Sequence, residues 1–352
     1  MKGNEAIAEA AMRAGADAYF GYPITPQSEI LEYLVEHNPA GTTGMVVLQA
    51  ESEVAAINMV YGAACAGQRV MTSSSGPGIS LMTEGLSYLA GAELPCLIVN
   101  VSRGGPGLGT IQPSQADYFQ STKGGGHGDY RLLVLAPASV QEMADFTVLG
   151  FELAFKYRNP VLILSDGVIG QMMEKVELPE RQSGRRGVAT WAVAGKPHDR
   201  ERNIITSLNL DALKHEKHNI KLQSKYRSME EAEPRFEAVL CDDAELIVVA
   251  YGASARISRK AVELAREQGI KAGLFRPITL FPFPAKELKA AAKDAKALLS
   301  VEMNAGQMIE DVQLAVECRI PVSHFGRYGG VIHAPDEILN AITSKAAVFV
   351  NN

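Results

Sequence analysis

The sequence contains 352 residues with 47% hydrophobic side chains and a formal net charge of −6. Such a chain can bury the cores of two domains. Its Lys and Arg residues are scattered rather than clustered, so we expect no nucleic acid partner. No apolar run approaches the ~18 residues that cross a bilayer, and the N-terminus lacks the apolar core of a signal peptide. We therefore expect no membrane span and a cytoplasmic location.

The four cysteines are far apart in the sequence, and none belongs to a CxxC pair. Two of them, Cys65 and Cys96, lie in apolar segments, which is typical of buried reduced thiols. The close ligand spacing of an iron–sulfur cluster or a zinc finger is missing, so we expect no metal site in this chain. Any electron carrier would therefore belong to another polypeptide. The remaining cysteines are Cys241 and Cys318.

Residues 1–175 alternate short apolar segments with helical ones, which predicts an α/β domain with a doubly wound parallel sheet. The segment Gly3–Ala14 has alanines on one helical face and is followed by Gly15, a common helix stop. A second helix is expected to begin near Ser28. The apolar segments are continuous and β-branched, as in parallel strands covered on both faces. These strands are expected at residues 18–22, 45–48, 70–73, 96–101, 132–135 and 161–164.

Residues 176–240 differ in character and are predicted to be an extension or connector. Within them, residues 188–194 favour a strand, and the highly charged residues 211–237 favour one or two solvated helices. Residues 241–352 return to the α/β pattern and predict a second domain. In that domain we expect a turn at Gly252 and an extended loop at residues 276–284, where three prolines exclude a helix. Its strands are expected at residues 246–251, 271–275 and 297–302, and its helices at residues 258–268 and 285–293.

A glutamate stands where a predicted strand leads into an alanine-rich helix. Helix entry at Ser52 and the Ala-Ala pair that follows favour Glu53 over Glu51 for a special role. A carboxylate at this position often does no more than complement the helix dipole. It can also activate thiamine diphosphate (ThDP), whose pyrimidine ring must touch a carboxylate before the thiazolium carbon loses its proton. We predict Glu53 as the catalytic residue.

The loop Ser73-Ser-Ser-Gly-Pro-Gly78 joins a strand to the following helix. Glycines allow close approach of the backbone, and serine hydroxyls with free N–H groups suit an anion or a polar ring. Strand–helix turns are also rich in Ser and Gly for conformational reasons alone. The position of the Ser73–Gly78 loop, one helix after Glu53 in the sequence, favours a ligand site. We therefore expect Ser75, Gly76 and Pro77 to contact a cofactor.

The segment Tyr22-Pro23-Ile24-Thr25-Pro26 closes the first predicted strand, at the end where parallel sheets bind their ligands. The two prolines fix the backbone around Thr25, so its hydroxyl would be preorganised. The alternative is a proline turn in which Thr25 caps the next helix.

A second segment of this kind, Asn100-Val-Ser-Arg103, ends a later strand and is followed by glycines. Its guanidinium suits a 2-oxo acid carboxylate, which it can hold with two hydrogen bonds. A surface salt bridge is the alternative role.

Two further polar segments carry no predicted chemistry. The glycine loop around His127 is interpreted as a flexible connector rather than a catalytic loop, and Glu302 to Gln307 as the entry to a helix.

Self-sufficient ThDP enzymes carry a Gly-Asp-Gly motif with a later Asn for Mg²⁺ and the diphosphate, and this chain lacks it. Its nearest candidate, Asp166-Gly167, stands in different surroundings. P-loop, GxGxxG and HExxH motifs are missing as well.

Taken together, these motifs resemble the α-type subunit of the 2-oxoacid:ferredoxin oxidoreductases over essentially the whole chain. The residues YPITP, the helix from Glu53 to Gly67, the SGPG loop and VSRGGPG follow the order of that family. The run from Gly107 to Tyr118, the Gly124–Gly128 loop and the run from Asp166 to Met173 look closest to the branched-chain type that acts on 2-oxoisovalerate. Relatives specific for 2-oxoglutarate are near neighbours.

The resemblance implies a role for each site residue. Glu53 would activate the pyrimidine ring of ThDP, with Pro23, Ser75, Gly76 and Pro77 also against the cofactor. Thr25 and Arg103 would contact the 2-oxo acid, beside Tyr22 and Ile24. The domain of residues 1–175 would be the pyrimidine-binding domain, and that of residues 241–352 would resemble the transketolase C-terminal domain.

The same resemblance implies partner subunits. A β-type subunit would carry the Mg²⁺ and diphosphate half of the ThDP site, and γ- and δ-type subunits would carry [4Fe–4S] clusters. Coenzyme A would take the acyl group and ferredoxin the electrons. Three alternatives stay open: the same reaction on 2-oxoglutarate or pyruvate, a non-oxidative decarboxylase or carboligase, and a non-catalytic scaffold subunit.

Overall fold

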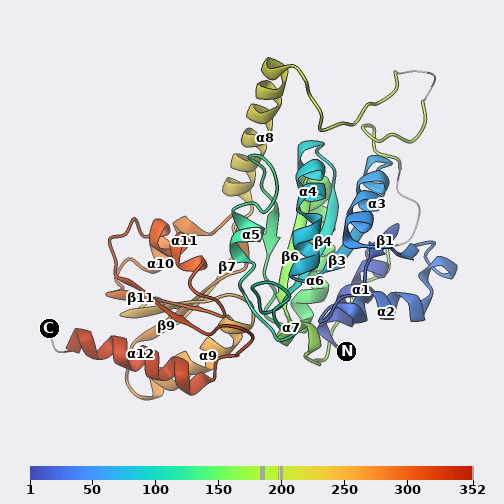
Figure 1. The fold of residues 1–352 in the computed structure, drawn as a ribbon. Coiled ribbons are helices and arrows are strands. Elements are labelled where there is room, and N and C mark those ends of the chain that lie inside the picture. The colour runs from blue at the N-terminus through green and yellow to red at the C-terminus, as the bar shows by residue number, and fades with distance from the viewer. Residues whose placement is uncertain (183–186, 197, 199–200, 351–352) are drawn as a thin grey trace.

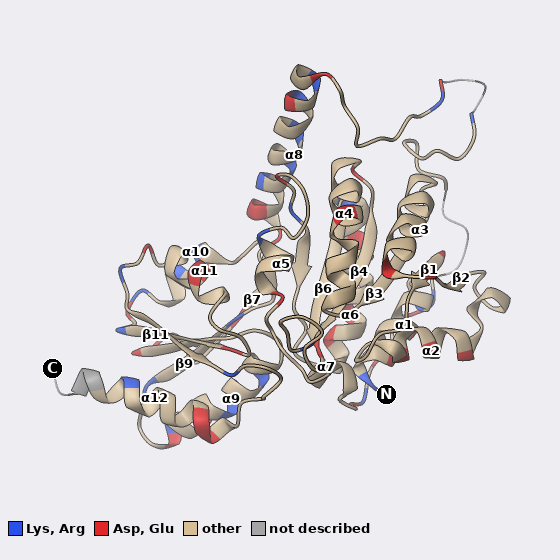
Figure 2. Ribbon diagram, viewed as in Figure 1, with Lys and Arg blue, Asp and Glu red and all other residues tan. Residues whose placement is uncertain are grey.

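The computed structural model describes residues 1–182, 187–196, 198 and 201–350, which form two α/β domains side by side (Figure 1). The first is built on a seven-stranded sheet and the second on a five-stranded sheet. Acidic and basic residues are interspersed on the outer helices (Figure 2). Among the described residues, no helix is both long enough and apolar enough to cross a membrane.

The first sheet is doubly wound, with the strand order β10-β5-β6-β4-β3-β1-β2, and only its edge strand β10 runs antiparallel to its neighbour. Its central strands are buried throughout, because helices cover both faces. Helices α3 and α4 pack on one face and helices α1, α2 and α6 on the other. The strands are β1 (Ala18–Gly21), β2 (Val46–Gln49), β3 (Val70–Ser74), β4 (Cys96–Ser102), β5 (Leu133–Leu135), β6 (Pro160–Asp166) and β10 (Thr279–Phe281).

Helices α1 and α2 of the first domain begin at the predicted residues, Gly3 and Ser28. Ser52 caps α3 and Ser139 caps α6, each accepting a hydrogen bond from a backbone N–H with its hydroxyl. The helices are α1 (Gly3–Arg13), α2 (Ser28–His37), α3 (Glu53–Cys65), α4 (Pro77–Gly91), α5 (Tyr118–Thr122), α6 (Val140–Tyr157) and α7 (Gly167–Gln171), with a short 3₁₀ turn η1 (Pro39–Gly41).

The second sheet has the order β12-β11-β8-β9-β7, and its edge strand β7 is antiparallel to β9. Its strands are β7 (Phe236–Val239), β8 (Leu246–Val249), β9 (Ala272–Pro277), β11 (Ala297–Glu302) and β12 (Val322–Gly326). The helices around it are α9 (Gly252–Glu267), α10 (Ala285–Ala291), α11 (Met308–Ala315) and α12 (Pro335–Val350). The predicted strand at residues 297–302 is confirmed at both ends.

Several sequence predictions are wrong in detail, among them the helix expected at residues 258–268, which as α9 already begins at Gly252. Residues 188–194 form no strand, because they turn over the end of α3, where the N–H of Val193 donates to the carbonyl of Cys65. The charged segment forms one long helix, α8 (Ala212–Ala232), followed by strand β7. The predicted loop at residues 276–284 contains strand β10, whose three residues lie between Pro277 and Pro282 and so keep the backbone N–H groups needed for pairing. The division of the chain at residues 175 and 240 stays a prediction.

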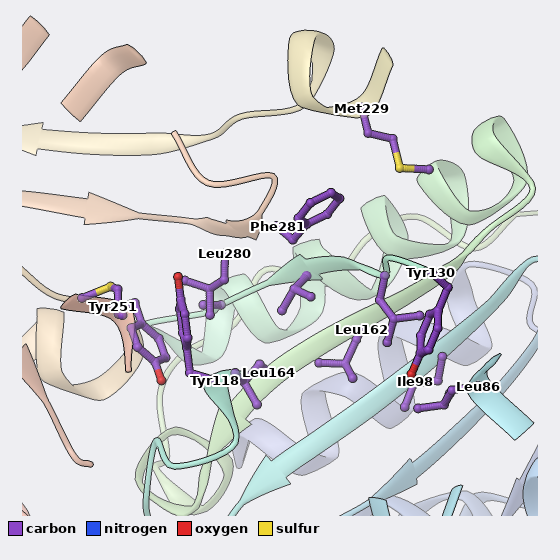
Figure 3. Packing of buried hydrophobic residues seen from close by; sticks show 14 of the residues in the cluster. Leu86, Ile98, Tyr118, Tyr130, Leu162, Leu164, Met229, Tyr251, Leu280 and Phe281 are labelled. Atoms are coloured by element: carbon purple, nitrogen blue, oxygen red, sulfur yellow. The ribbon is translucent and has the colours of Figure 1, made fainter. Parts of the chain in front are cut away.

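The two domains share an apolar core. Strand β10 reaches from the second domain to pair with β5 of the first, and it carries Leu280 and Phe281 into one buried cluster. In that cluster Tyr118 packs against Tyr251 of the second domain, with ring centroids 5.7 Å apart (Figure 3). Burial of aromatic surface on this scale fixes the two sheets relative to one another.

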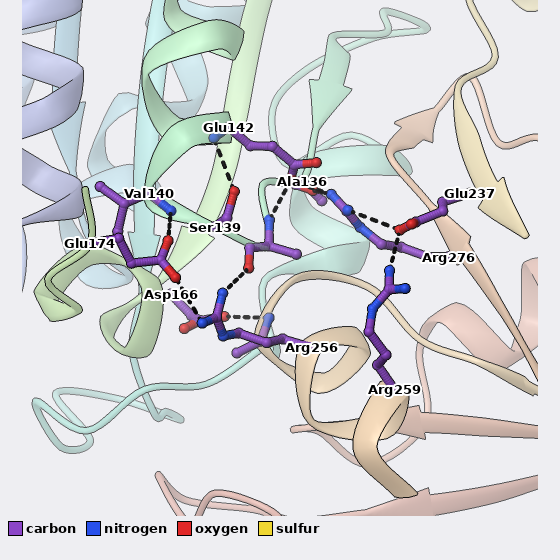
Figure 4. A network of polar contacts seen from close by, with 12 residues as sticks. Ala136, Ser139, Val140, Glu142, Asp166, Glu174, Glu237, Arg256, Arg259 and Arg276 are labelled. Atoms are coloured by element: carbon purple, nitrogen blue, oxygen red, sulfur yellow. Dashed lines mark hydrogen bonds and ion pairs between the residues drawn. The ribbon is translucent and has the colours of Figure 1, made fainter. Parts of the chain in front are cut away.

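A polar network continues the contact between the domains (Figure 4). Arg256 of α9 forms an ion pair with Glu174, 2.7 Å away, and Arg276 of β9 forms one with Glu142. The buried carboxylate of Asp166 accepts hydrogen bonds from two N–H groups of α7 and from Ala253 of α9. It therefore caps one helix from each domain.

This buried carboxylate makes stability depend on pH. Desolvation outweighs its hydrogen bonds and raises the pKa of Asp166 from 3.8 to about 6. Because the folded pKa lies above the unfolded one, Asp166 favours folding at about pH 4, and this contribution is lost as the pH rises through about 6. We expect Asp166→Asn, which cannot ionise, to gain about 2–3 kcal/mol relative to wild type between pH 4 and pH 7. Urea denaturation across this range measures it, and a pH-independent difference would contradict the assignment.

Candidate active site

The predicted site residues meet at one edge of the first sheet. Strands β1, β3 and β4 are neighbours and run parallel, so their carboxyl ends lie together. The Tyr22–Pro26 segment follows β1, the serine–glycine loop follows β3, and Arg103 follows β4. Strand β2, beside β1, leads into α3 and delivers Glu53 to the same edge.

The carboxylate of Glu53 is buried without a partner. Its side chain is 6% exposed, and among the described residues no hydrogen bond or ion pair reaches it. The N–H groups of the first turn are served by Ser52, whose hydroxyl accepts from Ala55 over 3.2 Å. Glu51, the rival, is exposed. A buried carboxylate with no partner is costly, and capping of α3 does not account for the burial of Glu53, because Ser52 makes the capping hydrogen bond.

The first turn of α4 lies directly on this carboxylate. A Cβ atom at Gly78 would stand 2.6 Å from Oε1 of Glu53 and 2.1 Å from Oγ of Ser74, distances that no side chain tolerates. The hydroxyls of Ser74 and Ser75 are buried and likewise have no hydrogen-bond partner within the described part of the chain. One carboxylate and two hydroxyls, all unpaired, therefore surround the N-terminus of α4, which itself favours polar and anionic groups.

Arg103 and Thr25 are brought together across the sheet edge. The guanidinium donates one hydrogen bond to the carbonyl of Thr25 and one to that of Leu108, each over 3.0 Å. A guanidinium has five N–H donors, so others stay available to a carboxylate. A Cβ atom at Gly76 would lie 3.5 Å from Cγ of Arg103, which places the serine–glycine loop against the same side chain.

Hydrogen bonds that involve Gln27 and strand β3 hold the Tyr22–Pro26 segment in place. Gln27 donates to the carbonyl of Tyr22 over 3.1 Å, and Ser73 of β3 donates to the Gln27 side chain over 2.5 Å. The Tyr19 hydroxyl lies 2.7 Å from that of Ser73, and burial raises the pKa of Tyr19 above its usual range. Tyr22, 37% exposed, and Thr25 face outward at the end of this supported segment.

Two residues near the site were not predicted from the sequence, and two polar segments considered in the sequence lie outside the site. Ser74 and Gly78 were not singled out, although the run of three serines and two glycines was a signal for both. His127 is not in the site, because its carbonyl bonds Ser87 in the later turns of α4. Glu302 accepts hydrogen bonds from three N–H groups at the start of α11, which confirms the predicted helix entry.

Comparison with known proteins gives a consistent result along the chain. Residues 9–239 match the family model described as "Pyruvate flavodoxin/ferredoxin oxidoreductase, thiamine diP-bdg", and residues 244–338 match "Pyruvate:ferredoxin oxidoreductase core domain II". The ketoisovalerate oxidoreductase subunit VorB of Methanothermobacter marburgensis is 54% identical, with 98% of this chain and 97% of that protein covered. The 2-oxoglutarate synthase subunit KorA of the same organism is 39% identical, with 97% of each covered.

Solved structures agree. The 2-oxoglutarate:ferredoxin oxidoreductase from Magnetococcus marinus, with 2-oxoglutarate, coenzyme A and succinyl-CoA bound, superposes with a TM-score of 0.84 at 29% identity, covering 98% of this chain and 65% of that one. A split-gene transketolase, at 13% identity and a TM-score of 0.64, shares the fold alone. The resemblance seen in the sequence motifs is confirmed: this chain belongs to the pyruvate flavodoxin/ferredoxin oxidoreductase family of 2-oxoacid oxidoreductase subunits.

Proposed function

We propose that this chain is the pyrimidine-binding subunit of a ThDP-dependent enzyme that converts a branched-chain 2-oxo acid, 2-oxoisovalerate, to its acyl-CoA with ferredoxin as electron acceptor. The observation that carries the proposal is the buried, unpaired carboxylate of Glu53 beneath the first turn of α4. The relatives that are 54% identical over nearly the whole chain are ketoisovalerate oxidoreductase subunits, which favours oxidation over the decarboxylase, carboligase and scaffold alternatives.

The residues at this edge fit the pyrimidine half of ThDP. When bound, this cofactor supplies a carbanion that attacks a 2-oxo carbon and stores the electron pair released with CO₂. Glu53 would hold a proton at the ring nitrogen that faces its carboxylate. The hydroxyls of Ser74 and Ser75, unpaired among the described residues, would hydrogen-bond polar groups of the ring. Because Gly78 has no side chain, the space beside the Glu53 carboxylate stays open. Pro23, Gly76 and Pro77 would line the remaining walls.

The substrate would lie between Thr25 and Arg103. Arg103 would hold the carboxylate with the N–H groups that do not bond Thr25 or Leu108, and the Thr25 hydroxyl would orient the oxo group. Tyr22 and Ile24, on the same short segment, would contact the aliphatic part of the substrate. Relatives are named for 2-oxoglutarate as well as for ketoisovalerate, and the family model is named for pyruvate, so 2-oxoglutarate and pyruvate are the other substrates to test.

Partner subunits would complete the site. The outer face of α3 supports this, because Val54 and Met59 are 44% and 38% exposed there and a Cβ atom at Gly62 would meet nothing within 4 Å. We propose that a β-type subunit carrying Mg²⁺ and the diphosphate site packs on this face. Subunits of the γ and δ type with [4Fe–4S] clusters would pass two electrons to ferredoxin, while the acyl group goes to coenzyme A and the carboxylate leaves as CO₂.

The test is an assay of the complex that co-purifies with this chain. Coenzyme A-dependent reduction of ferredoxin or a viologen dye is measured with 2-oxoisovalerate, pyruvate and 2-oxoglutarate. We expect kcat/KM to be at least about tenfold higher for 2-oxoisovalerate, since each methylene fitted into an apolar pocket is worth about 1–3 kcal/mol. Preference for another acid would overturn the substrate, and decarboxylation without coenzyme A or an electron acceptor would overturn the oxidative reaction.

A further inference from the structure

The second domain holds the loop that carries Arg103. After β4 the chain forms a narrow loop that returns beside its own start: Arg103 pairs with Pro113 in an antiparallel bridge, and the N–H of Gly104 donates to the carbonyl of Gln112 over 2.9 Å. Within the loop, the N–H of Thr110 donates to the carbonyl of Gly104 over 2.7 Å. The position of Arg103 therefore depends on the returning strand, residues 112–115.

Gln115 fastens this returning strand to the second domain. Its side chain, 2% exposed, donates to the carbonyl of Tyr251 over 2.8 Å and accepts from the hydroxyl of Ser254 and the N–H of Met303, over 2.7 and 3.0 Å. Its backbone N–H donates to the carbonyl of Met303 over 3.0 Å, and its carbonyl accepts from Tyr251 and Asn304. Six hydrogen bonds from one residue all lead into the second domain.

The same loop touches the second domain at another point. A Cβ atom at Gly104 would lie 3.0 Å from the backbone of Gly329 and Gly330, and one at Gly330 would lie 2.4 Å from Cβ of Gln112. At these glycines the backbone of the loop and the backbone of the second domain are in direct contact, so neither can move toward the other. The loop between Arg103 and Pro113 is therefore held on one side by its own sheet and on the other by the second domain.

We propose that Gln115 is a positioning residue: by fastening the returning strand to the second domain, it holds the Arg103 guanidinium where it receives the substrate carboxylate. The proposal rests on the proposed function, because it assigns a substrate to Arg103. It gives the second domain a part in substrate binding. A purely structural Gln115 would stabilise the contact between the domains without affecting substrate affinity, and the two roles differ in what a substitution changes.

The test uses Gln115→Met in the assembled complex. Methionine keeps the volume and removes the three side-chain hydrogen bonds, while the backbone bonds stay. We expect KM for the preferred 2-oxo acid to rise roughly tenfold with kcat little changed, because a binding interaction is lost rather than a chemical step. Amide hydrogen exchange at Gly104 and Thr110 should also become faster without substrate, since the loop loses its outer support. An unchanged KM would overturn the proposal.

A double-mutant cycle decides whether Gln115 acts through Arg103. If it does, Arg103→Met and the Arg103→Met/Gln115→Met double variant should have the same kcat/KM within about twofold. Additive losses would overturn the proposal. Arg256→Gln is the matched control: it breaks an ion pair between the domains, on α9 (Figure 4), without touching the loop, and should leave KM unchanged. If Arg256→Gln raised KM as much as Gln115→Met does, any weakening of the contact between the domains would raise KM, and the effect would not be specific to Gln115.

Two further outcomes need their own measurements: a Gln115→Met variant that does not fold, and a wild-type complex that has no activity. If Gln115→Met does not fold, Ser254→Ala removes one of the three bonds and should raise KM in the same direction by a smaller factor; an unchanged KM in this variant overturns the proposal. A wild-type complex without coenzyme A-dependent activity on any of the three acids would overturn the proposed function instead. Amide exchange at Gly104 and Thr110 would then still decide whether Gln115 holds the loop.

Discussion

Glu53→Gln is expected to lower kcat of the coenzyme A-dependent oxidation by roughly 10²–10⁴-fold, the range for loss of a placed acid–base group. Glutamine has the same shape, so cofactor affinity should change much less than kcat. Because the carboxylate is buried without a partner among the described residues, its replacement by a neutral amide removes the cost of desolvating a charge. The melting temperature of the variant should therefore equal or exceed that of wild type. Steady-state kinetics and a thermal melt of the same preparation measure both effects.

Glu51→Gln is the control for this result. Glu51 lies two residues earlier and is exposed, so the variant should keep wild-type kcat and melting temperature. Full activity in Glu53→Gln would remove Glu53 as the activating residue. Loss of activity in Glu51→Gln, with Glu53→Gln active, would assign the role to Glu51.

Gly78→Ala is expected to have the second-largest effect, although it adds a single methyl group. That methyl would stand 2.1 Å from Oγ of Ser74 and 2.6 Å from Oε1 of Glu53. Glu53 must then move by about an ångström, and misplacement on this scale costs about 10²-fold in rate. Affinity for ThDP should fall together with kcat, because the room beside the carboxylate is lost. Titration of the purified complex with ThDP, followed by activity and by tryptophan fluorescence, separates the two effects.

Gly91→Ala is the matched control on the same helix. Gly91 is the last residue of α4, and a Cβ atom there would make an ordinary contact at 3.5 Å with Ser207. Alanine favours helix over glycine, so this variant should be as stable as wild type or slightly more so, with unchanged kcat. If both alanine variants lost activity equally, a general disturbance of α4 would explain the loss rather than displacement of Glu53.

Much of the first sheet was predictable because its strands are buried on both faces. Segments such as residues 96–99 and 161–164 are continuously apolar, and β4 and β6 occupy them with every residue buried. The same buried strands made the meeting of the polar segments at one sheet edge predictable, since the carboxyl ends of parallel strands collect the segments that follow them. Thr25, Glu53, Gly76 and Arg103 could thus be named together before their contacts were known.

Two of the edge strands, β7 and β10, were not predictable for the converse reason. Strands β7 and β10 are short, and one lies in a charged segment while the other lies between prolines. An edge strand is stabilised by the neighbour it pairs with, and β10 finds that neighbour in the other domain, at β5. No pattern within residues 276–284 reports a partner more than a hundred positions away. The failed strand at residues 188–194 has a related cause, because this segment turns over the end of α3, where the N–H of Val193 donates to the carbonyl of Cys65, instead of pairing with a sheet.

Local patterns therefore established the elements of the first sheet, the identity of the polar segments at its edge and the family of the chain, because burial and turn formation act on neighbouring residues. Tertiary structure alone decided which polar atoms stay unpaired. Among the described residues, the hydroxyls of Ser74 and Ser75 are buried without a hydrogen-bond partner, and they lie beside the buried Glu53. Tertiary structure also decided that Gln115 belongs to both domains, since its six hydrogen bonds join residues more than 130 positions apart. Hydrogen bonds between distant segments depend on how the sheets pack, and packing is a property of the whole chain.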